Sequence, residues 1–269
     1  MERPPWAPAE ADLDRPSVAR VYDFYLGGSH NFESDRAFAQ EVLRAVPDLP
    51  AVARDNRAFL RRAVRYLCDV GLDQFLDLGS GIPTVGNVHE VARRANPTAR
   101  VVYVDRDPVA VVHSRLLLEG DDLTTAVLAD VRDAPRVLDL ARGAGLDLDR
   151  PVAVLAVSLL HFLADDDRPA ELMARYLAAL PPGSHLAVSH SNSRPSPEFT
   201  EAARIYARPG SPQVIRLRTP EEIGALFGDL ELVPPGLVHL PRWRPDPGDE
   251  EEIEVADDYP VHGGVGRKP

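Results

Sequence analysis

The sequence contains almost no cysteine or lysine, and it has no long apolar segment. Cys68 is the only cysteine among the 269 residues, which excludes an intrachain disulfide and a cysteine-cluster metal site. Lys268 is the only lysine, which excludes the lysine of a Walker phosphate-binding loop. No apolar run approaches the roughly 20 residues of a membrane-spanning helix, and the N-terminal segment has no apolar stretch. These absences predict a cytoplasmic protein without a signal peptide or a membrane anchor.

Acidic residues outnumber basic ones, and the histidines are scattered. Lys plus Arg is 30 and Asp plus Glu is 42, which gives a formal net charge of −12. Because such a surface repels a phosphate backbone, nucleic acid is not expected as a partner. The eight histidines show no H-x-x-x-H or H-E-x-x-H spacing, so no metal site is expected. We interpret Arg61, Arg62 and Arg65 as a solvated helix face.

The first 70 residues divide into a tail and a helical segment. Residues 1–15 are rich in proline and acidic side chains, so we expect a disordered N-terminal tail. Residues 16–70 are predicted to form a helical cap. Its clearest helix runs from Val52 to Cys68, where apolar side chains recur at spacings of three and four. Two shorter helices, ending near Leu26 and Val46, are expected before it.

Residues 71–269 alternate between short apolar runs and helical segments. The runs are rich in β-branched residues, and several end in glycine or an acidic residue, which is typical of strands in βαβ units. We predict one α/β domain here: a Rossmann-like, mostly parallel seven-stranded sheet with helices on both faces. The predicted strands are 74–78, 100–105, 124–129, 151–157, 185–189, 230–240 and 259–267.

Glycines and an acidic residue follow the first predicted strand. In an open α/β sheet, ligands bind at the carboxyl ends of the strands, so Asp77, Gly79, Ser80 and Gly81 are candidate ligand contacts. Glycines at these positions allow a ligand to approach the backbone, and Asp77 could accept hydrogen bonds from an ammonium group. A nicotinamide fingerprint requires a third glycine, and Thr84 stands at that position. A tight strand–helix turn is the structural alternative.

The next two strand ends carry further acidic residues. Asp105 is placed to accept both hydroxyls of a ribose, and Arg106 follows it, whereas Asp107 is expected to cap the next helix. At the third strand end, Asp130 could accept from an adenine amine, and the amide of Val131 could reach a ring nitrogen. Together these strand ends predict contacts to an amine, a ribose and an adenine, in that order.

The fourth strand end faces the substrate in this architecture. Ser158 is a candidate cofactor contact there, and His161 is the best-placed titratable group, so we predict that His161 is the catalytic residue. A histidine packed beneath a loop is the structural alternative. His190, after the fifth strand, is a second and weaker candidate.

The sequence resembles a known family. The runs FLDLGSGIPT, VVYVDRDPVAVVHSR and ADVRD are similar to the first three motifs of class I S-adenosylmethionine-dependent methyltransferases. The segments YDFYLGGSHNF, ARDNRAFLRRAVRYL, SLLHFL, PRWRP and GGVGRKP resemble one narrower group, the S-adenosyl methyltransferases. This resemblance implies a Rossmann-like class I methyltransferase fold. It also implies S-adenosylmethionine as the cofactor, which becomes S-adenosylhomocysteine, but it does not identify the acceptor.

The upstream motif also has a physical interpretation. Tyr22 lies within a short aromatic helix, and Gly28 and Asn31 follow in a loop. We expect this segment to cover the cofactor as a lid, with Tyr22, Gly28 and Asn31 among its contacts. The alternative is an apolar staple that packs the helix onto the sheet.

These observations predict a methyltransferase that acts on the oxygen or nitrogen of a small-molecule acceptor. No membrane or nucleic-acid partner is expected, and both a monomer and a homodimer remain open. Two alternatives remain: a non-catalytic protein that binds S-adenosylmethionine or another nucleoside, and, less favoured, a nicotinamide-dependent oxidoreductase.

Overall fold

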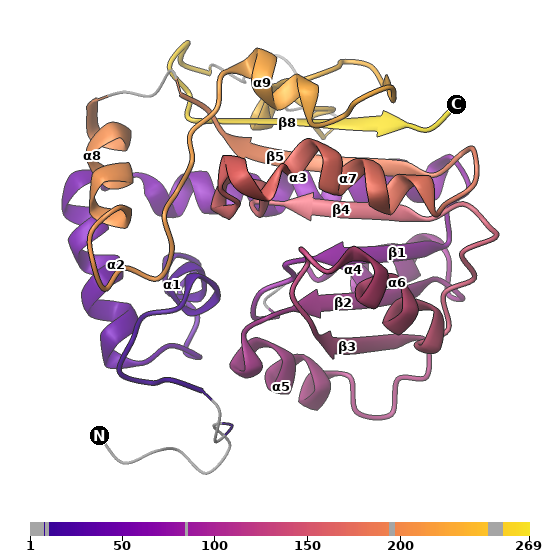
Figure 1. The fold of residues 1–269 in the computed structure, drawn as a ribbon, viewed down its shortest axis with the longest axis horizontal. Coiled ribbons are helices and arrows are strands. Elements are labelled where there is room, and N and C mark those ends of the chain that lie inside the picture. The colour runs from indigo at the N-terminus through magenta and orange to yellow at the C-terminus, as the bar shows by residue number, and fades with distance from the viewer. Residues whose placement is uncertain (1–7, 9–10, 84–85, 194–196, 247–254) are drawn as a thin grey trace.

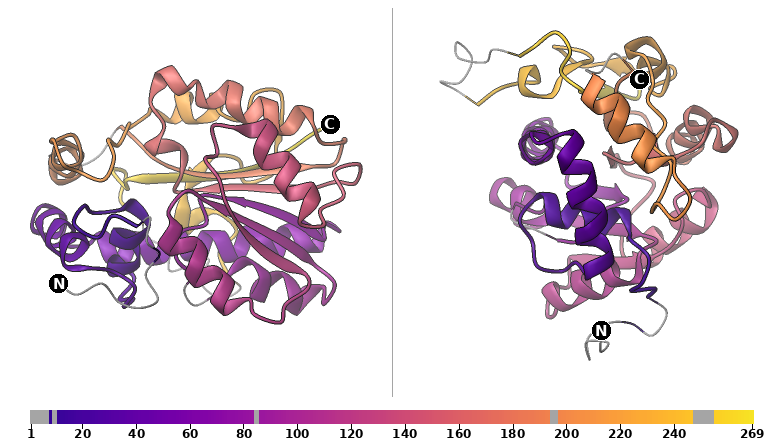
Figure 2. Two further views of the ribbon diagram at one scale, coloured as in Figure 1. Left: turned by 60° about the horizontal axis from the view of Figure 1, so that its bottom comes forward. Right: turned by 90° about the vertical axis from the view of Figure 1, so that its left-hand side faces the viewer.

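A sheet packed between two helical layers forms the centre of the molecule, and a helical cap lies at one end (Figures 1 and 2). The computed structural model describes all residues except 1–7, 9–10, 84–85, 194–196 and 247–254. The helices of the described residues are α1 (Val18–Tyr25), α2 (Glu33–Ala45), α3 (Leu49–Asp69), α4 (Val88–Ala95), α5 (Pro108–Leu117), α6 (Ala134–Gly143), α7 (Pro169–Ala178), α8 (Pro197–Tyr206) and α9 (Pro220–Ala225), with single turns η1 (Leu160–Phe162), η2 (Asp165–Asp167) and η3 (Leu240–Arg242).

The sheet has eight strands and confirms the predicted α/β class. They are β1 (Gln74–Leu78), β2 (Arg100–Asp105), β3 (Thr124–Leu128), β4 (Ala153–Val157), β5 (His185–Ser191), β6 (Glu231–Leu232), β7 (Val238–His239) and β8 (Val261–Arg267). Their order is β3-β2-β1-β4-β5-β8-β6, with β7 also on β8. The first five are parallel to their neighbours, whereas β8 is antiparallel to β5. The order reverses between β1 and β4, which is where such sheets bind ligands.

One predicted strand is divided in two. The sequence predicts a continuous strand over 230–240, but the structure has the short strands β6 and β7, which both pair with β8. Between them lie Pro234, Pro235 and Gly236. Proline cannot donate a ladder hydrogen bond, so the run cannot continue as one strand. This division explains why the sheet has eight strands rather than seven.

Two apolar clusters bind the helices to the two faces of the sheet. One joins α6, α7 and α9 to the first face, and its largest buried side chains include Tyr176, Met173 and Leu160. The other joins α3, α4 and η3 to the second face around Phe59, Phe75 and Trp243. The strands β1, β4 and β5 are therefore buried on both faces, as their uninterrupted apolar runs require.

The cap is built from two distant parts of the chain. Val21 and Tyr25 of α1 and Val42 of α2 pack against Ile205 and Tyr206 of α8 in a separate apolar cluster. Figure 2 shows α8 beside the indigo helices of the cap. The predicted boundary of 16–70 omitted α8, because its sequence gives no indication of its distant partner.

The first fifteen residues are only partly described. Residues 1–7 and 9–10 lie outside the described part, and so does most of the acidic stretch 246–258. Ala11, near the end of the tail for which disorder is predicted, is buried against Phe32 and Ala110. The backbone oxygen of Asp12 accepts hydrogen bonds from both terminal nitrogens of Arg20, at 3.0 Å each. Ala11 and Asp12 therefore pack with the cap.

The arginine-rich face of α3 is not uniformly solvated. Arg62 is buried, and the prediction was wrong for it: its Nε donates to the backbone oxygen of Trp243 at 2.8 Å, and its Nη2 to that of Leu240 at 2.7 Å. Arg65 is exposed and pairs with Asp246. The neighbouring segment η3 is 178 residues away in sequence, so helical spacing alone could not separate these two arginines.

Replacing Arg62 should therefore cost far more than replacing Arg65. Arg62→Met removes the charged donor of two buried carbonyl oxygens, and only that of Leu240 keeps another donor, the amide of Trp243, so we expect the free energy of unfolding to fall by about 3 kcal/mol. Arg65→Met is the matched control and should cost less than about 1 kcal/mol, because exposed ion pairs contribute little. Urea unfolding of both variants measures the difference. Equal losses would show that the contacts to η3 contribute nothing specific.

Candidate active site

A cavity of about 550 Å³ lies between the cap and the carboxyl ends of β1, β2, β3 and β4. It brings together most of the residues that the sequence predicts as cofactor contacts or as the catalytic residue. Those on its wall are Tyr22, Asp77, Gly79, Ser80, Gly81, Asp105, Arg106, Asp130, Val131, Ser158 and His161. Gly28 and Asn31 are not on the wall.

The loop after β1 presents its backbone to the cavity. Gly79 and Gly81 have φ of +67° and +65°, which favour glycine. A Cβ at Gly79 would lie 2.5 Å from Leu159 Cδ1, whereas one at Gly81 would meet open space. Gly79 is therefore required for packing against the β4 loop, and Gly81 leaves room for a ligand.

Asp77 is buried on the cavity wall without a hydrogen-bond partner among the described residues. Burial raises its pKa to about 7, and the charge of Arg57 partly opposes that shift. Removing a carboxyl from water disfavours its ionised form unless a cation compensates. Asp77 is thus suited to a ligand that brings a positive charge.

Asp105 holds the loops after β1 and β2 together. Its Oδ2 accepts from the amide of Gly81 and its Oδ1 from the amide of Asp107, both at 2.8 Å. Burial raises its pKa to about 6, although these two amides act in the opposite direction. Carboxylate oxygens have further lone pairs, so Asp105 can still accept from hydroxyl groups of a ligand.

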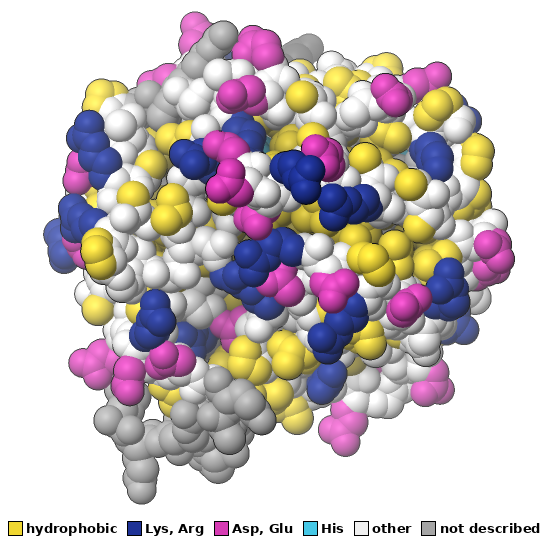
Figure 3. All heavy atoms as spheres, in the orientation of Figure 1, with side chains coloured by type: hydrophobic (Ala, Val, Ile, Leu, Met, Phe, Trp, Pro, Cys, Tyr) yellow, Lys and Arg dark blue, Asp and Glu magenta, His cyan; other side chains and the backbone are white. Residues whose placement is uncertain are grey.

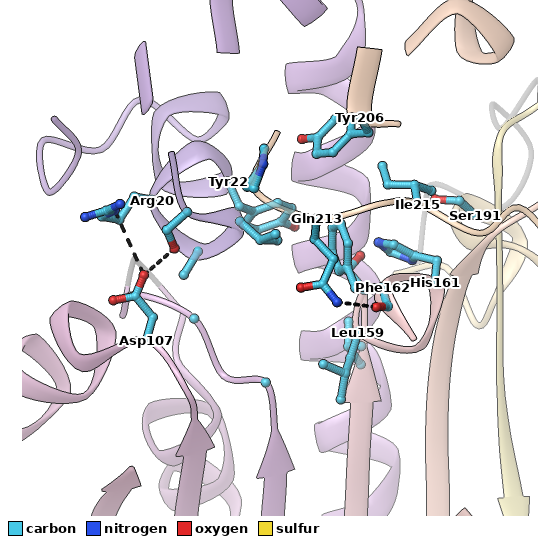
Figure 4. A pocket seen from close by; sticks show the side chains of 18 of the residues that line it. Arg20, Tyr22, Asp107, Leu159, His161, Phe162, Ser191, Tyr206, Gln213 and Ile215 are labelled. Carbon is cyan, nitrogen blue, oxygen red and sulfur yellow. Dashed lines mark hydrogen bonds and ion pairs between the residues drawn. The ribbon is translucent and has the colours of Figure 1, made fainter. Parts of the chain in front are cut away.

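Asp107 caps α5, as predicted, and also holds the cap. Its Oδ1 accepts from the amide of Val109 at 2.8 Å, and its other oxygen accepts from the hydroxyl of Ser17. Arg20, which pairs with Asp35 at 3.2 Å, lies 4.0 Å from the same oxygen (Figure 4). The N-terminus of α1 is therefore tied to the edge of the cavity.

At the end of β3, both candidate residues make contacts within the chain. Asp130 is already paired with Arg132, whose Nη2 lies 2.5 Å from Oδ2, and this hydrogen bond lowers the pKa of Asp130. The backbone oxygen of Val131 accepts from the hydroxyl of Tyr176 at 2.7 Å. Arg132 thus favours the ionised form of Asp130 and fixes the orientation of its carboxylate.

A chain of hydrogen bonds links the cap to the sheet below the cavity. The amide of Ser158 donates to Ser189 Oγ at 2.8 Å, and that hydroxyl donates to Asn56 Oδ1 at 2.6 Å. Asn56 Nδ2 then donates to the hydroxyl of Tyr22 at 2.9 Å, which itself donates to Ala53. Tyr22 and Ser158 therefore occupy fixed positions on the wall.

His161 lies on η1 with its ring directed into the cavity (Figure 4). It is 6% exposed, and its Nδ1 is buried without a hydrogen-bond partner. Burial holds its pKa well below the ordinary value, and the neighbouring His190 and Arg218 act in the same direction. His161 is consequently a neutral imidazole at physiological pH.

His190 is engaged in structural contacts. Its Nδ1 lies 2.7 Å from the backbone oxygen of Ser191, and its Nε2 accepts from Arg218 Nη1 at 2.9 Å. Burial lowers its pKa to about 4. With both ring nitrogens in use, His190 is less available than His161 for proton transfer.

Several wall residues were not found by sequence reasoning. Arg57 donates through Nη2 to the backbone oxygen of Gly86 at 3.2 Å, while its Nε is buried without a partner. Asn56 lies beside it, and Tyr206 and Gln213 come from α8 and the segment after it. The motif ARDNRAF was the available signal for the first two, but helix position alone assigns them no role.

Gly28 and Asn31 form a turn around Asp23. Asn31 Nδ2 donates to Asp23 Oδ2 at 2.8 Å and to the backbone oxygen of Gly28 at 2.9 Å. A Cβ at Gly28 would lie 2.0 Å from Asp23 Oδ1. This turn lies in the cap, outside the cavity, and its hydrogen bonds fix the end of α1.

Acidic and basic side chains are mixed over the face of the molecule shown in Figure 3. No group of three potential metal ligands occurs among the described residues. In the same part of the chain, no helix combines the length and apolarity that crossing a membrane requires.

Known structures share this architecture. A Thermobifida fusca protein, described as a candidate methyltransferase, is 42% identical with a TM-score of 0.90, covering 98% of this chain and 99% of its own. A DUF574-family protein from Streptomyces avermitilis is 38% identical with a TM-score of 0.90, covering 96% and 99%. Human N-acetylserotonin methyltransferase, at 16% identity and a TM-score of 0.50, covers 92% and 70% and shows only the shared fold.

No curated protein matches the sequence. A family model described as S-adenosyl methyltransferase, however, matches residues 4–269, which is nearly the whole chain. With the parallel sheet, the glycine loop after β1 and the acidic residues at the strand ends, this match shows that the chain belongs to the S-adenosyl methyltransferase family.

Proposed function

We propose that this methyltransferase binds S-adenosylmethionine along the ends of β1, β2 and β3 and methylates a small molecule beside His161. The observation that carries the proposal is the single cavity that joins Asp77 and Asp105 to His161. S-adenosylmethionine supplies an electrophilic methyl group on a sulfonium when bound. An oxidoreductase is not favoured, since Thr84 replaces the third glycine of a nicotinamide fingerprint.

The residues of the wall fit this cofactor. Asp77 is a buried carboxyl that lacks a hydrogen-bonded cation, and Arg57 Nε is a buried donor without a partner. Together they would hold the ammonium and the carboxylate of the amino-acid end. Asp105 would accept from the ribose hydroxyls, and Asp130 and Val131 would contact the adenine.

The acceptor side needs a group that removes a proton. In methyl transfer to a hydroxyl, a lone pair of the oxygen forms the new C–O bond, the S–C electron pair goes to sulfur, and the hydroxyl proton must leave. His161 would take that proton, because its ring is neutral and faces the cavity. Alignment within the closed cavity would supply much of the remaining acceleration.

Asp105 should contribute directly to cofactor affinity. We expect Asp105→Ala to raise the Kd for S-adenosylhomocysteine about 10- to 100-fold, because charge-assisted hydrogen bonds to two hydroxyls are lost. Asp133→Ala is the control: this acid caps α6 and is not on the cavity wall, so only about 1 kcal/mol of stability should be lost. Calorimetry on folded variants separates the two, and equal affinities would contradict the ribose assignment.

Cofactor affinity should increase as pH rises. The pKa values of Asp77 and Asp105 are raised to about 7 and about 6, so both acids are partly protonated in mildly acidic solution. A ligand ammonium favours the ionised Asp77 and displaces its proton. The Kd for S-adenosylhomocysteine should therefore fall from pH 5.5 to pH 7, by up to about tenfold per unit, and then level off.

Titration calorimetry at several pH values measures this dependence. Asp77→Asn should weaken binding and flatten the pH profile above pH 6. A wild-type profile that is already flat between pH 5.5 and pH 7.5 would show that Asp77 does not face the ammonium.

His161 should affect the rate and not cofactor binding. We expect His161→Gln to leave the Kd for S-adenosylhomocysteine unchanged and to lower methyl transfer to a hydroxyl acceptor by roughly 10²- to 10⁴-fold. In the wild type the rate should stay on its plateau at pH 6.5, since the pKa of His161 lies well below that value. Loss of cofactor binding in the variant would place His161 in the cofactor site instead.

A further inference from the structure

The cavity wall is divided into a charged end and an apolar end. Its charged side chains come from residues 12–20, from Arg57 and from the ends of β1, β2 and β3. The opposite end is lined by the start of η1, by α8 and by the segment 212–217. Figure 4 shows the division: Arg20 and Asp107 lie on one side, and His161, Phe162, Tyr206 and Ile215 on the other.

Aromatic rings dominate the apolar end. The rings of His161 and Phe162 are 4.3 Å apart, and those of Phe162 and Tyr206 are 6.4 Å apart. Phe199 of α8 and Tyr25 of α1 complete this part of the wall. Rings at such separations pack against one another, and together they give this end of the cavity an aromatic wall.

The polar groups at this end are largely paired with one another. The hydroxyls of Tyr25 and Tyr206 share a hydrogen bond of 3.4 Å, and burial raises the pKa of both, so they stay uncharged. Gln213 Nε2 donates to the backbone oxygen of Phe162 at 2.5 Å, and its Oε1 accepts from Arg106. The buried Nδ1 of His161 is left without a partner.

We propose that the apolar end binds an uncharged aromatic hydroxyl compound, with its ring among Phe162, Phe199 and Tyr206 and its hydroxyl toward His161. The inference rests on the proposed function and narrows its acceptor to one chemical class. None of the described residues lining this end carries a formal charge. An ionised acceptor would lose its hydration there, and Arg106, the cation that reaches this end, already donates to Gln213, so burying the charge is costly.

Three naphthalene probes test whether the apolar end prefers an uncharged ligand to a charged one. Protein saturated with S-adenosylhomocysteine is titrated with 2-naphthol, with 2-naphthoate and with 2-(aminomethyl)naphthalene, followed by naphthalene fluorescence at neutral pH. We expect 2-naphthol to bind about tenfold more tightly than either charged probe. Equal or tighter binding of a charged probe would overturn the proposal.

A pair of variants locates the binding. Ala203 of α8 lies on the cavity wall, and Ala207 is exposed just beyond the helix. Ala203→Phe should weaken 2-naphthol binding about tenfold or more by filling the apolar end, whereas Ala207→Phe should leave it unchanged. Unchanged 2-naphthol binding in folded Ala203→Phe would also overturn the proposal.

The affinity for S-adenosylhomocysteine, measured on the same samples, distinguishes failure of the proposed function from failure of the proposed acceptor class. If S-adenosylhomocysteine does not bind the wild type, the proposed function itself fails. If it binds and 2-naphthol does not, the proposed function stands and the acceptor class is wrong.

Discussion

The side chain of Asn56 is the contact on which the geometry of the site depends. It is buried, and its amide bonds to Tyr22 of the cap on one side and to Ser189 of the sheet on the other. Ser189 in turn holds the amide of Ser158, whose φ of 53° turns the chain sharply after β4. Because a buried polar group left unpaired costs about 1–3 kcal/mol, the cap, α3 and the β4 loop can only shift together. The positions of Tyr22 and Ser158 on the cavity wall follow from this link.

A second buried anchor, Arg218, fixes the apolar end of the cavity. Arg218 donates to the backbone oxygens of Leu160 and Leu163 and to Asp165, and thereby fastens the segment after α8 to η1. The amide of Arg216 donates to the backbone oxygen of His161 at 2.7 Å. The segment that closes the apolar end therefore also orients the histidine. The shape of the apolar end and the position of His161 depend on the same few contacts.

Burial shifts the pKa values at the two ends of the cavity in opposite directions. Asp77 and Asp105 are buried acids with raised pKa values, so the protein holds them at an energetic cost that a cationic, hydroxyl-bearing ligand would relieve. His161 is buried in the neutral form, because burial holds its pKa well below the ordinary value. Both effects arise from excluding water, which the cap achieves by covering the strand ends.

The sequence alone determined the parallel sheet and the strand-end residues, because β-branched runs and the acids or glycines that end them are local patterns. It located Asp77, Gly81, Asp105 and His161 on one edge, and that edge is where the cavity lies. Only the tertiary structure decided that Arg62 is buried, that α8 completes the cap, and that Arg57 and Asn56 face the cavity. The physical reason is the same in each case. The residues that contact these side chains lie far away in sequence, and the helical pattern around an arginine or asparagine is the same whether the side chain faces water or a buried carbonyl.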